Sequence, residues 1–130
     1  MKRLISTLVA IGGLAALAAP ALAQDAQEPA KVAVASEEAM LAGDWNSATV
    51  IAGRAYREDP NLRTEMNLAT AYEHDGQAAL AIPLYRDLEV KGQFTWTQAL
   101  YDYRNGPRPD RVQFNYAEEA HRRLARLTGE

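Results

Sequence analysis

The chain contains no cysteine among its 130 residues, so disulfides and thiolate chemistry are excluded and stability has to come from packing. Its two histidines, His74 and His121, stand far apart in the sequence and lack the spacing of a metal site. The formal charge is −3 and no segment is strongly basic, which argues against nucleic acid and anionic membrane surfaces as partners. We therefore expect no bound metal and no cofactor.

Motifs of known catalytic chemistry are also missing. Ser36 and Ser47 have no G-x-S-x-G surroundings, and the sequence contains no phosphate-binding loop. The acidic pairs Glu37-Glu38, Glu58-Asp59 and Glu118-Glu119 are poor acid/base pairs, because adjacent residues point apart on a helix. The sequence thus predicts that the chain is not an enzyme.

The first 23 residues have the pattern of a secretory signal peptide. Lys2 and Arg3 precede an apolar run from Leu4 to Ala19, and residues 20–23 end in an A-x-A cleavage site. A membrane anchor is the alternative, but the run is short and is closed by Pro20. We expect cleavage before Gln24, no stable membrane insertion afterwards, and a periplasmic or secreted protein. Loss of the two basic residues takes the formal charge to −5.

Two helical patterns separated by a glycine dominate the segment Asn61 to Val90. Asn61 can cap the first helix, and Gly76 can take the left-handed conformation that ends it. Apolar residues recur at helical spacing on both sides of the glycine: Leu68, Ala69 and Tyr72, then Ala81, Ile82, Tyr85 and Leu88. So tight a turn requires the two helices to lie antiparallel, stripe against stripe.

The same arrangement occurs one repeat upstream. Gly43 precedes Gly76 by 33 residues, and Ala48 precedes Ala81 by the same distance. The segment from residue 61 carries Glu65-x2-Leu68-Ala69-x2-Tyr72 and then Ala81-x3-Tyr85, and Trp96-x2-Ala99-Leu100-x2-Tyr103 repeats the first half. These patterns and this period resemble the tetratricopeptide (TPR) repeat family. The resemblance implies an all-α fold: a right-handed stack of about three antiparallel helix pairs (a TPR-like α-solenoid), with the last pair degenerate.

The repeat register also predicts the boundaries of the helices. The helical domain spans residues 31–127 and follows a flexible mature N-terminus at 24–30. Its first helix ends near Leu41, and the next runs from Trp45, capped by Asp44, to about Arg57. Pro83 should bend the helix in which it lies.

Two further helices are expected after residue 94. Thr95 and Gln98 fit a capping box for a helix from Trp96 to Arg104, although Phe94, Trp96, Tyr101 and Tyr103 leave a strand or hairpin arm as the alternative. Asp110 and Gln113 fit a second capping box, for a final helix from Arg111 to Leu127.

The resemblance implies that first helices line a concave groove that binds a protein or peptide partner. Eight groove residues follow from the register: Arg63, Met66, Asn67, Thr70, His74, Thr97, Tyr101 and Arg104. Ala33 and Glu37 occupy the positions of the family's carboxylate clamp, which argues against a C-terminal carboxylate as ligand. The sequence therefore predicts a periplasmic interaction module, a scaffold or adaptor. A self-associating envelope protein is the alternative, and a small enzyme is a weaker one.

Overall fold

The computed structural model describes the backbone of residues 30–102 and 106–130, and the side chains of residues 30–97 and 113–130. The expected signal peptide (1–23), and all of the expected flexible terminus except Ala30, lie outside the described residues. Within them the fold is mostly helical, with one antiparallel two-stranded hairpin. The elements are a helix at residues 30–41, α2 (Trp45–Glu58), α3 (Leu62–His74), α4 (Ala78–Lys91), β1 (Trp96–Asp102), β2 (Gly106–Asn115) and α5 (Tyr116–Thr128).

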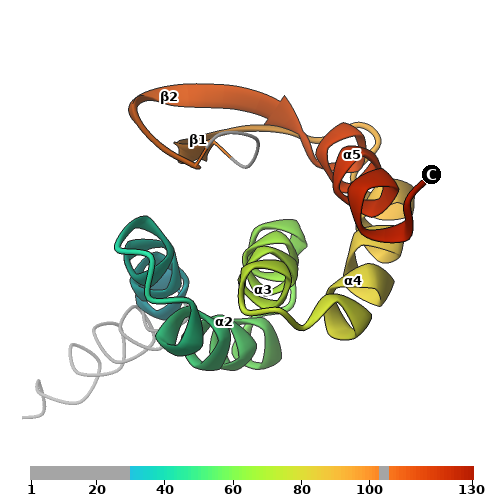
Figure 1. Ribbon diagram of the computed structural model, residues 1–130. Coiled ribbons are helices and arrows are strands. Elements are labelled where there is room, and N and C mark those ends of the chain that lie inside the picture. Colours follow the sequence, from blue (N-terminus) through green and yellow to red (C-terminus); the bar gives the residue numbers. More distant parts are fainter. Residues whose placement is uncertain (1–29, 103–105) are drawn as a thin grey trace, which may run out of the picture.

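The helices follow one another along an arc, and the hairpin lies over the inner side of that arc (Figure 1). Contacts join each helix to the next, α2 to α3, α3 to α4 and α4 to α5. The chain passes from α4 into the hairpin and returns from it into α5. The hairpin is thus an excursion between two helices that pack against each other.

Gly43 and Gly76 occupy equivalent turns, as the 33-residue period predicts. Their φ angles are 73° and 76°, a left-handed conformation that glycine adopts without a steric penalty. The amide that follows each glycine bonds back to the helix: Asp44 N donates to Ala39 O at 3.0 Å, and Gln77 N donates to Tyr72 O at 2.8 Å. Since α2 and α4 also start 33 residues apart, the structure repeats with the period of the sequence.

The predicted helix caps at Asp44 and Asn61 are confirmed. Asp44 Oδ1 accepts from Ser47 N at 3.1 Å at the start of α2. At the start of α3, Asn61 Oδ1 accepts from Thr64 N and Thr64 Oγ1 accepts from Asn61 N, both at 3.0 Å. Each cap satisfies amide groups that have no partner within the helix. The helix α4 continues through Pro83.

The core lies where α3 meets its neighbours. Every residue of α3 from Thr64 to Ala71 is buried, so this helix is enclosed on all sides. The small residues Ala48, Ala52 and Ala55 of α2 are fully buried, as expected of a face that lets a partner helix approach closely. Larger side chains fill the remaining space: Met40, Met66, Leu68, Tyr85, Leu88, Phe114, Tyr116 and Leu124.

The helix predicted from Trp96 to Arg104 is wrong, and the hairpin alternative is correct. Residues 96–102 form β1, in which Trp96 pairs with Asn115 and Thr97 with Phe114. Aromatic and β-branched residues favour a pleated, half-buried surface, and this preference outweighs the capping-box pattern. The third helix pair therefore has no first helix.

The predicted start of the last helix is also wrong. Residues 106–115 form β2, and α5 begins at Tyr116, where Asn115 Oδ1 accepts from Glu118 N at 3.1 Å. Pro107 and Pro109 disfavour helix, and Val112 and Phe114 alternate with polar residues at the period of a strand. The capping box at Asp110 and Gln113 therefore does not form.

Candidate functional site

The expected groove is closed along the middle of α3. Met66, Asn67 and Thr70 are fully buried, so the expectation that they are exposed to a partner is wrong. Phe114 of β2 and Tyr116 of α5 belong to the same buried cluster as Met66, and the hairpin lies over the inner side of the arc in Figure 1. The chain's own C-terminal region thus helps to bury these residues.

The other predicted groove residues are spread over the molecule. His74, at the end of α3, is exposed and stacks on Trp45, with ring centroids 4.0 Å apart. Thr97 is half-buried, and Tyr101 lies in β1; neither is on a helix. Arg104 and the side chain of Tyr101 lie outside the described residues. The structure therefore does not bring the eight residues together on one helical surface.

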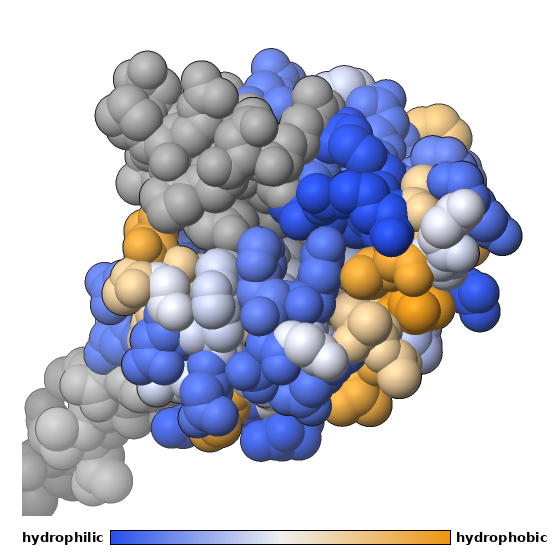
Figure 2. Space-filling view, in the orientation of Figure 1, coloured by the Kyte–Doolittle hydropathy of each residue, from blue (hydrophilic) through white to orange (hydrophobic). Residues whose placement is uncertain are grey.

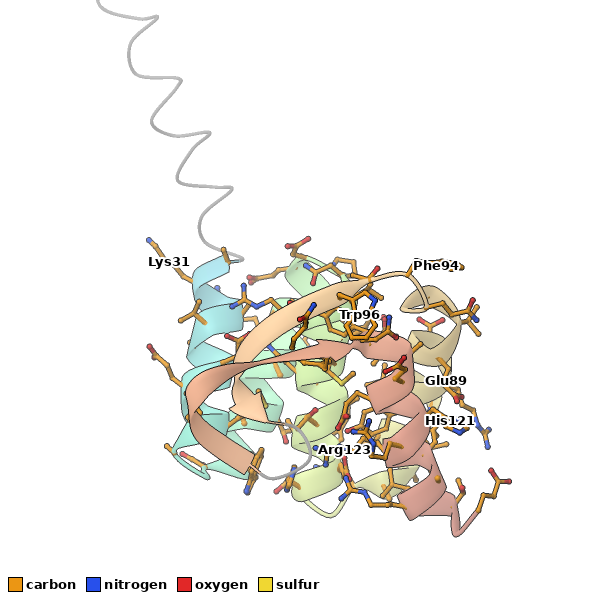
Figure 3. The ribbon with its side chains drawn as sticks, turned by 90° about the horizontal axis from the view of Figure 1, so that it is seen from above. Lys31, Glu89, Phe94, Trp96, His121 and Arg123 are labelled. Atoms are coloured by element: carbon orange, nitrogen blue, oxygen red, sulfur yellow. The ribbon has the colours of Figure 1, made fainter. Side chains whose placement is uncertain are left out.

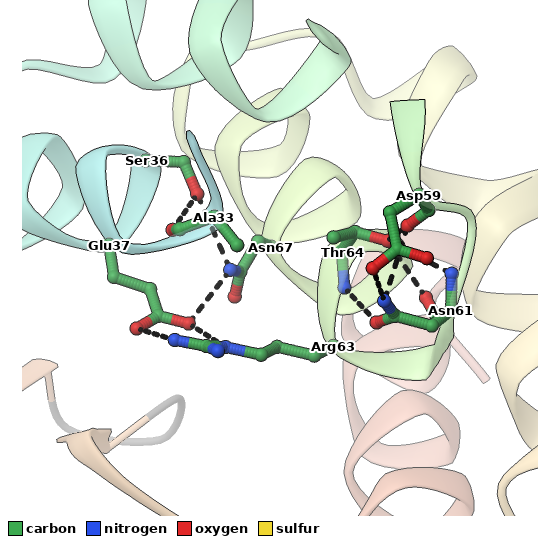
Figure 4. A network of polar contacts seen from close by, with 8 residues as sticks. All are labelled: Ala33, Ser36, Glu37, Asp59, Asn61, Arg63, Thr64 and Asn67. Carbon is green, nitrogen blue, oxygen red and sulfur yellow. Dashed lines mark hydrogen bonds and ion pairs between the residues drawn. The ribbon is translucent and has the colours of Figure 1, made fainter. Parts of the chain in front are cut away.

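Asn67 takes part in an internal polar network (Figure 4). Its Nδ2 donates to Glu37 Oε1 at 3.0 Å and to Ser36 Oγ at 3.4 Å. Arg63 binds the same carboxylate in bidentate fashion, with Nε donating to Oε1 at 2.6 Å and Nη2 to Oε2 at 2.8 Å. These bonds join α3 to the helix at 30–41. Asn67 therefore serves the interface between two helices and leaves Arg63 at its edge.

Arg63 lies on a partly exposed rim, with 45% of its side chain accessible. The base of the hairpin is close to it, because Tyr116 shares a hydrogen bond with Thr97 and feels the charges of Arg63 and Glu37. Burial raises the pKa of the Tyr116 hydroxyl, while Thr97 and Arg63 lower it. This rim thus joins α3, β1 and α5.

Two large aromatic side chains are exposed near the base of the hairpin. Phe94 is 92% exposed in the turn after α4, and Trp96, the first residue of β1, is 57% exposed (Figure 3). Other exposed apolar residues lie on the helices, and Figure 2 shows such an area over α4, where Leu80 is exposed. We name Phe94 and Trp96 the aromatic rim.

A buried ionic network connects α3, α4 and α5. The Tyr85 hydroxyl donates to Glu73 Oε2 at 2.6 Å, and Arg123 Nη1 lies 3.4 Å from Glu73 Oε1. Arg123 Nε donates to Glu119 Oε1 at 3.0 Å. Burial raises the pKa of Tyr85 well above its usual value, and the charge of Glu73 adds to the effect. The hydroxyl therefore stays protonated and donates to the carboxylate.

Glu65 is a buried acidic residue whose burial was not predicted from the sequence. Its side chain is 2% exposed, and Glu65 Oε1 has no hydrogen-bond partner. Burial raises the pKa of Glu65 to about 7, helped by a hydrogen bond with Asp87. Asp87 in turn is paired with Lys91. A signal was available, because Glu65 stands in the same helical stripe as Leu68 and Ala69, where an acid is unexpected.

The part of the chain that the structure describes contains neither a candidate metal site nor a candidate membrane-spanning helix. Within residues 30–102 and 106–130, no group of three or more His, Asp or Glu side chains is arranged to hold a metal ion. No helix of those residues is long and apolar enough to cross a membrane. Comparison of the chain with protein-family models, with curated proteins and with solved structures finds no match.

Proposed function

We propose that this chain is a protein-interaction module that resembles TPR repeats and binds a protein or peptide partner. Two helix pairs with a 33-residue offset and matching glycine turns support the proposal, since repeats of this length are typical of stacked helical hairpins. In the proposed arrangement the pairs stack as a short right-handed solenoid. Such stacks function by presenting a surface, and their terminal elements need a polar outer face.

The observation that carries the proposal is the exposure of Phe94 and Trp96 at the base of the hairpin. Tryptophan and arginine are enriched among residues that dominate binding energy, and large exposed aromatic side chains cost solubility unless they serve a contact. Because the middle of α3 is covered, the partner binds the aromatic rim instead of a groove along α3. Arg63 keeps its predicted role in this proposal, whereas Met66, Asn67 and Thr70 support it from within.

We also propose export, on the pattern of the first 23 residues. The partner is then a protein of the periplasm or the cell exterior. Self-association, the alternative, is less well supported at the C-terminal end. The outer face of α5 carries exposed polar residues such as Glu118, His121 and Arg126, which do not favour burial against a second copy.

Site-specific photo-crosslinking tests the proposal in the envelope. A photoreactive phenylalanine analogue replaces Trp96 in one variant and Val50 in another, because Val50 is an equally exposed apolar residue on α2, away from the aromatic rim. We expect an adduct with one partner at position 96 and not at position 50. Arg63→Ala should weaken formation of this adduct, while loss of its partly exposed ion pair with Glu37 should cost about 1 kcal/mol of stability or less.

Two results would overturn the proposal. Equal labelling at positions 50 and 96 would mean that the aromatic rim is not a specific contact surface. An adduct consisting of two copies of this chain would replace the interaction module by the self-associating protein. In the first case the exposed aromatic residues would need another explanation, and in the second they would contact a second copy of the chain.

A further inference from the structure

A cavity of about 270 Å³ opens where the end of α2, the start of α3 and the end of α4 meet. Its lining consists of Tyr56, Pro60, Asn61, Leu62, Glu65 and Lys91. The volume is close to the lower end of the range, roughly 300–1,000 Å³, in which small-molecule sites fall. The cavity lies between α2, α3 and α4, and its lining includes neither Phe94 nor Trp96.

Glu65 lines this cavity and has a carboxyl oxygen without a hydrogen-bond partner. The carboxyl is almost completely buried, and its Oε1 atom has no hydrogen-bond partner. Asp87 acts on the same carboxyl and helps to raise its pKa. A buried polar atom without a partner costs about 1–3 kcal/mol, so a native structure seldom keeps one without a reason. A hydrogen-bond donor supplied by a ligand would satisfy it.

The charges around Glu65 indicate the sign of the charge that the ligand carries. Lys91 is the cation of the cluster, and it already forms an ion pair with Asp87. When Glu65 is ionised, two carboxylates therefore share one ammonium group, and the cluster carries one uncompensated negative charge. Tyr56, the titratable group contributed by α2, is neutral at physiological pH. A cation with N–H donors fits this environment, and an anion does not.

The remaining lining indicates the shape of the cation. Leu62 and Pro60 offer apolar surface, and Tyr56 offers an aromatic ring that attracts positive charge. We propose that this cavity binds a primary alkylammonium group, with its nitrogen donating to the Glu65 carboxylate and its alkyl chain lying against Leu62 and Pro60. A free alkylamine and a lysine side chain of another protein carry the same chemistry.

Binding is coupled to a proton. Glu65 and Asp87 share a proton in the empty cluster, and burial together with Asp87 raises the pKa of Glu65 to about 7. The ammonium replaces that proton as the compensating charge, and the proton passes to solvent. Affinity should therefore rise between about pH 5.5 and about pH 8, as Glu65 loses its proton.

Calorimetric titration of the full chain with n-butylammonium chloride tests the inference, with Nα-acetyl-lysine methylamide as a second probe. Butan-1-ol is the neutral match, and sodium chloride controls for ionic strength. We expect both ammonium probes to bind more tightly at about pH 8 than at about pH 5.5, and butanol not to bind. Binding of the lysine derivative alone would assign the site to a lysine side chain and would also support the inference.

Two variants separate the site from general electrostatics. Glu65→Gln keeps the shape of the side chain and removes its charge, so it should weaken binding about tenfold or more. Glu89→Gln makes the same chemical change at a different place, on α4, at a residue paired with His121. It should leave binding unchanged. Absence of binding by both probes, or equal binding by the Glu65→Gln variant and the unmodified chain, would overturn the inference whatever the outcome at the aromatic rim.

Discussion

At the scale of single residues, Glu65 makes folding depend on pH. In the folded chain its pKa rises from 4.5 to about 7, so the folded state holds the proton more tightly than the unfolded state. The contribution of Glu65 to folding stability should therefore be fully present below pH 4.5 and fall as the pH rises from 4.5 toward 7. Above about pH 7 this contribution is lost. Burial lowers the pKa of His74 from 6.5, which opposes the effect of Glu65 within the same window. The lowered pKa of Asp87 also opposes it, but only at pH values below the usual pKa of 3.8.

Thermal melting at several pH values measures this effect. The unmodified chain should melt at a lower temperature at about pH 8 than at about pH 5, and Glu65→Gln should remove most of the difference. Glu58→Gln is the matched control, because Glu58 is an exposed residue of α2 that pairs with Arg54. A pH dependence that survives in the Glu65→Gln variant would show that another group titrates.

Tyr85 makes a second prediction at this scale. Its hydroxyl is buried and donates to Glu73, which also faces Arg123. Tyr85→Phe keeps the ring and removes the donor, and should cost about 1–3 kcal/mol because the acceptor is charged and mostly buried. Urea denaturation gives the free energy of unfolding. Tyr72→Phe, on a half-buried residue of α3, provides a comparison of the same chemical change, and an equal loss there would contradict the role of Glu73.

Single residues also show which features of the candidate site could be predicted from the sequence. The bidentate pair of Arg63 and Glu37 joins residues 26 apart, so nothing in the local pattern reveals it. Asn67 was predicted to face a partner, but it is buried and bonds to Ser36 and Glu37 in the helix at 30–41, contacts that could not be read from the sequence. Glu65, in contrast, interrupts an apolar stripe and could have been noticed from its position alone.

At the scale of elements, the helix pairs follow local rules and the hairpin does not. Gly43, Gly76 and Asn61 each fix a boundary through their own backbone or side chain, and all three boundaries were predicted. The segment after Phe94 has both a helix-capping pattern and a strand composition. Pairing between Thr97 and Phe114, 17 residues apart, decides between them. Such a contact is absent from any local window, so the helix prediction failed there.

Gly92 allows the end of α4 to pack closely against the start of α5, because it has no side chain. A Cβ at this position would lie 2.6 Å from Tyr116 Cβ and 2.9 Å from Ala117 N, which are fixed parts of α5. Gly92→Ala should therefore push the two helices apart and cost about 1–3 kcal/mol or more through overpacking. Chemical denaturation measures the loss.

Two other glycines separate this effect from backbone strain. A Cβ at Gly43 would meet nothing within 4 Å, so Gly43→Ala tests only the cost of the left-handed conformation, about 1 kcal/mol. At Gly53 in α2, the nearest atom is the mobile end of Arg57 at 3.3 Å, and Gly53→Ala should be nearly neutral or stabilising. If Gly92→Ala costs no more than Gly43→Ala, close packing of α4 on α5 is not what fixes their distance.

At the scale of the whole molecule, the hairpin is an insertion whose two ends meet. Tyr116 N donates to Thr95 O at 3.3 Å, and Asn115 Nδ2 donates to Gln93 O at 2.9 Å. The chain thus leaves and re-enters the helical part at one point. The helices on either side are joined without the hairpin, through the contact of α4 with α5 and the ion pair of Arg123 with Glu73.

Replacement of residues 96–114 by a short Gly-Ser linker should therefore leave the helices folded. The loss of buried Phe114 should cost about 3–5 kcal/mol, and exposure of Met66 and its neighbours should increase binding of a hydrophobic dye. Phe114→Ala in the full chain is the control, since it makes the same loss of packing without removing the hairpin. Circular dichroism follows the helices. If the shortened chain loses its helical signal while Phe114→Ala keeps it, the hairpin is part of the helical fold and not an addition to it.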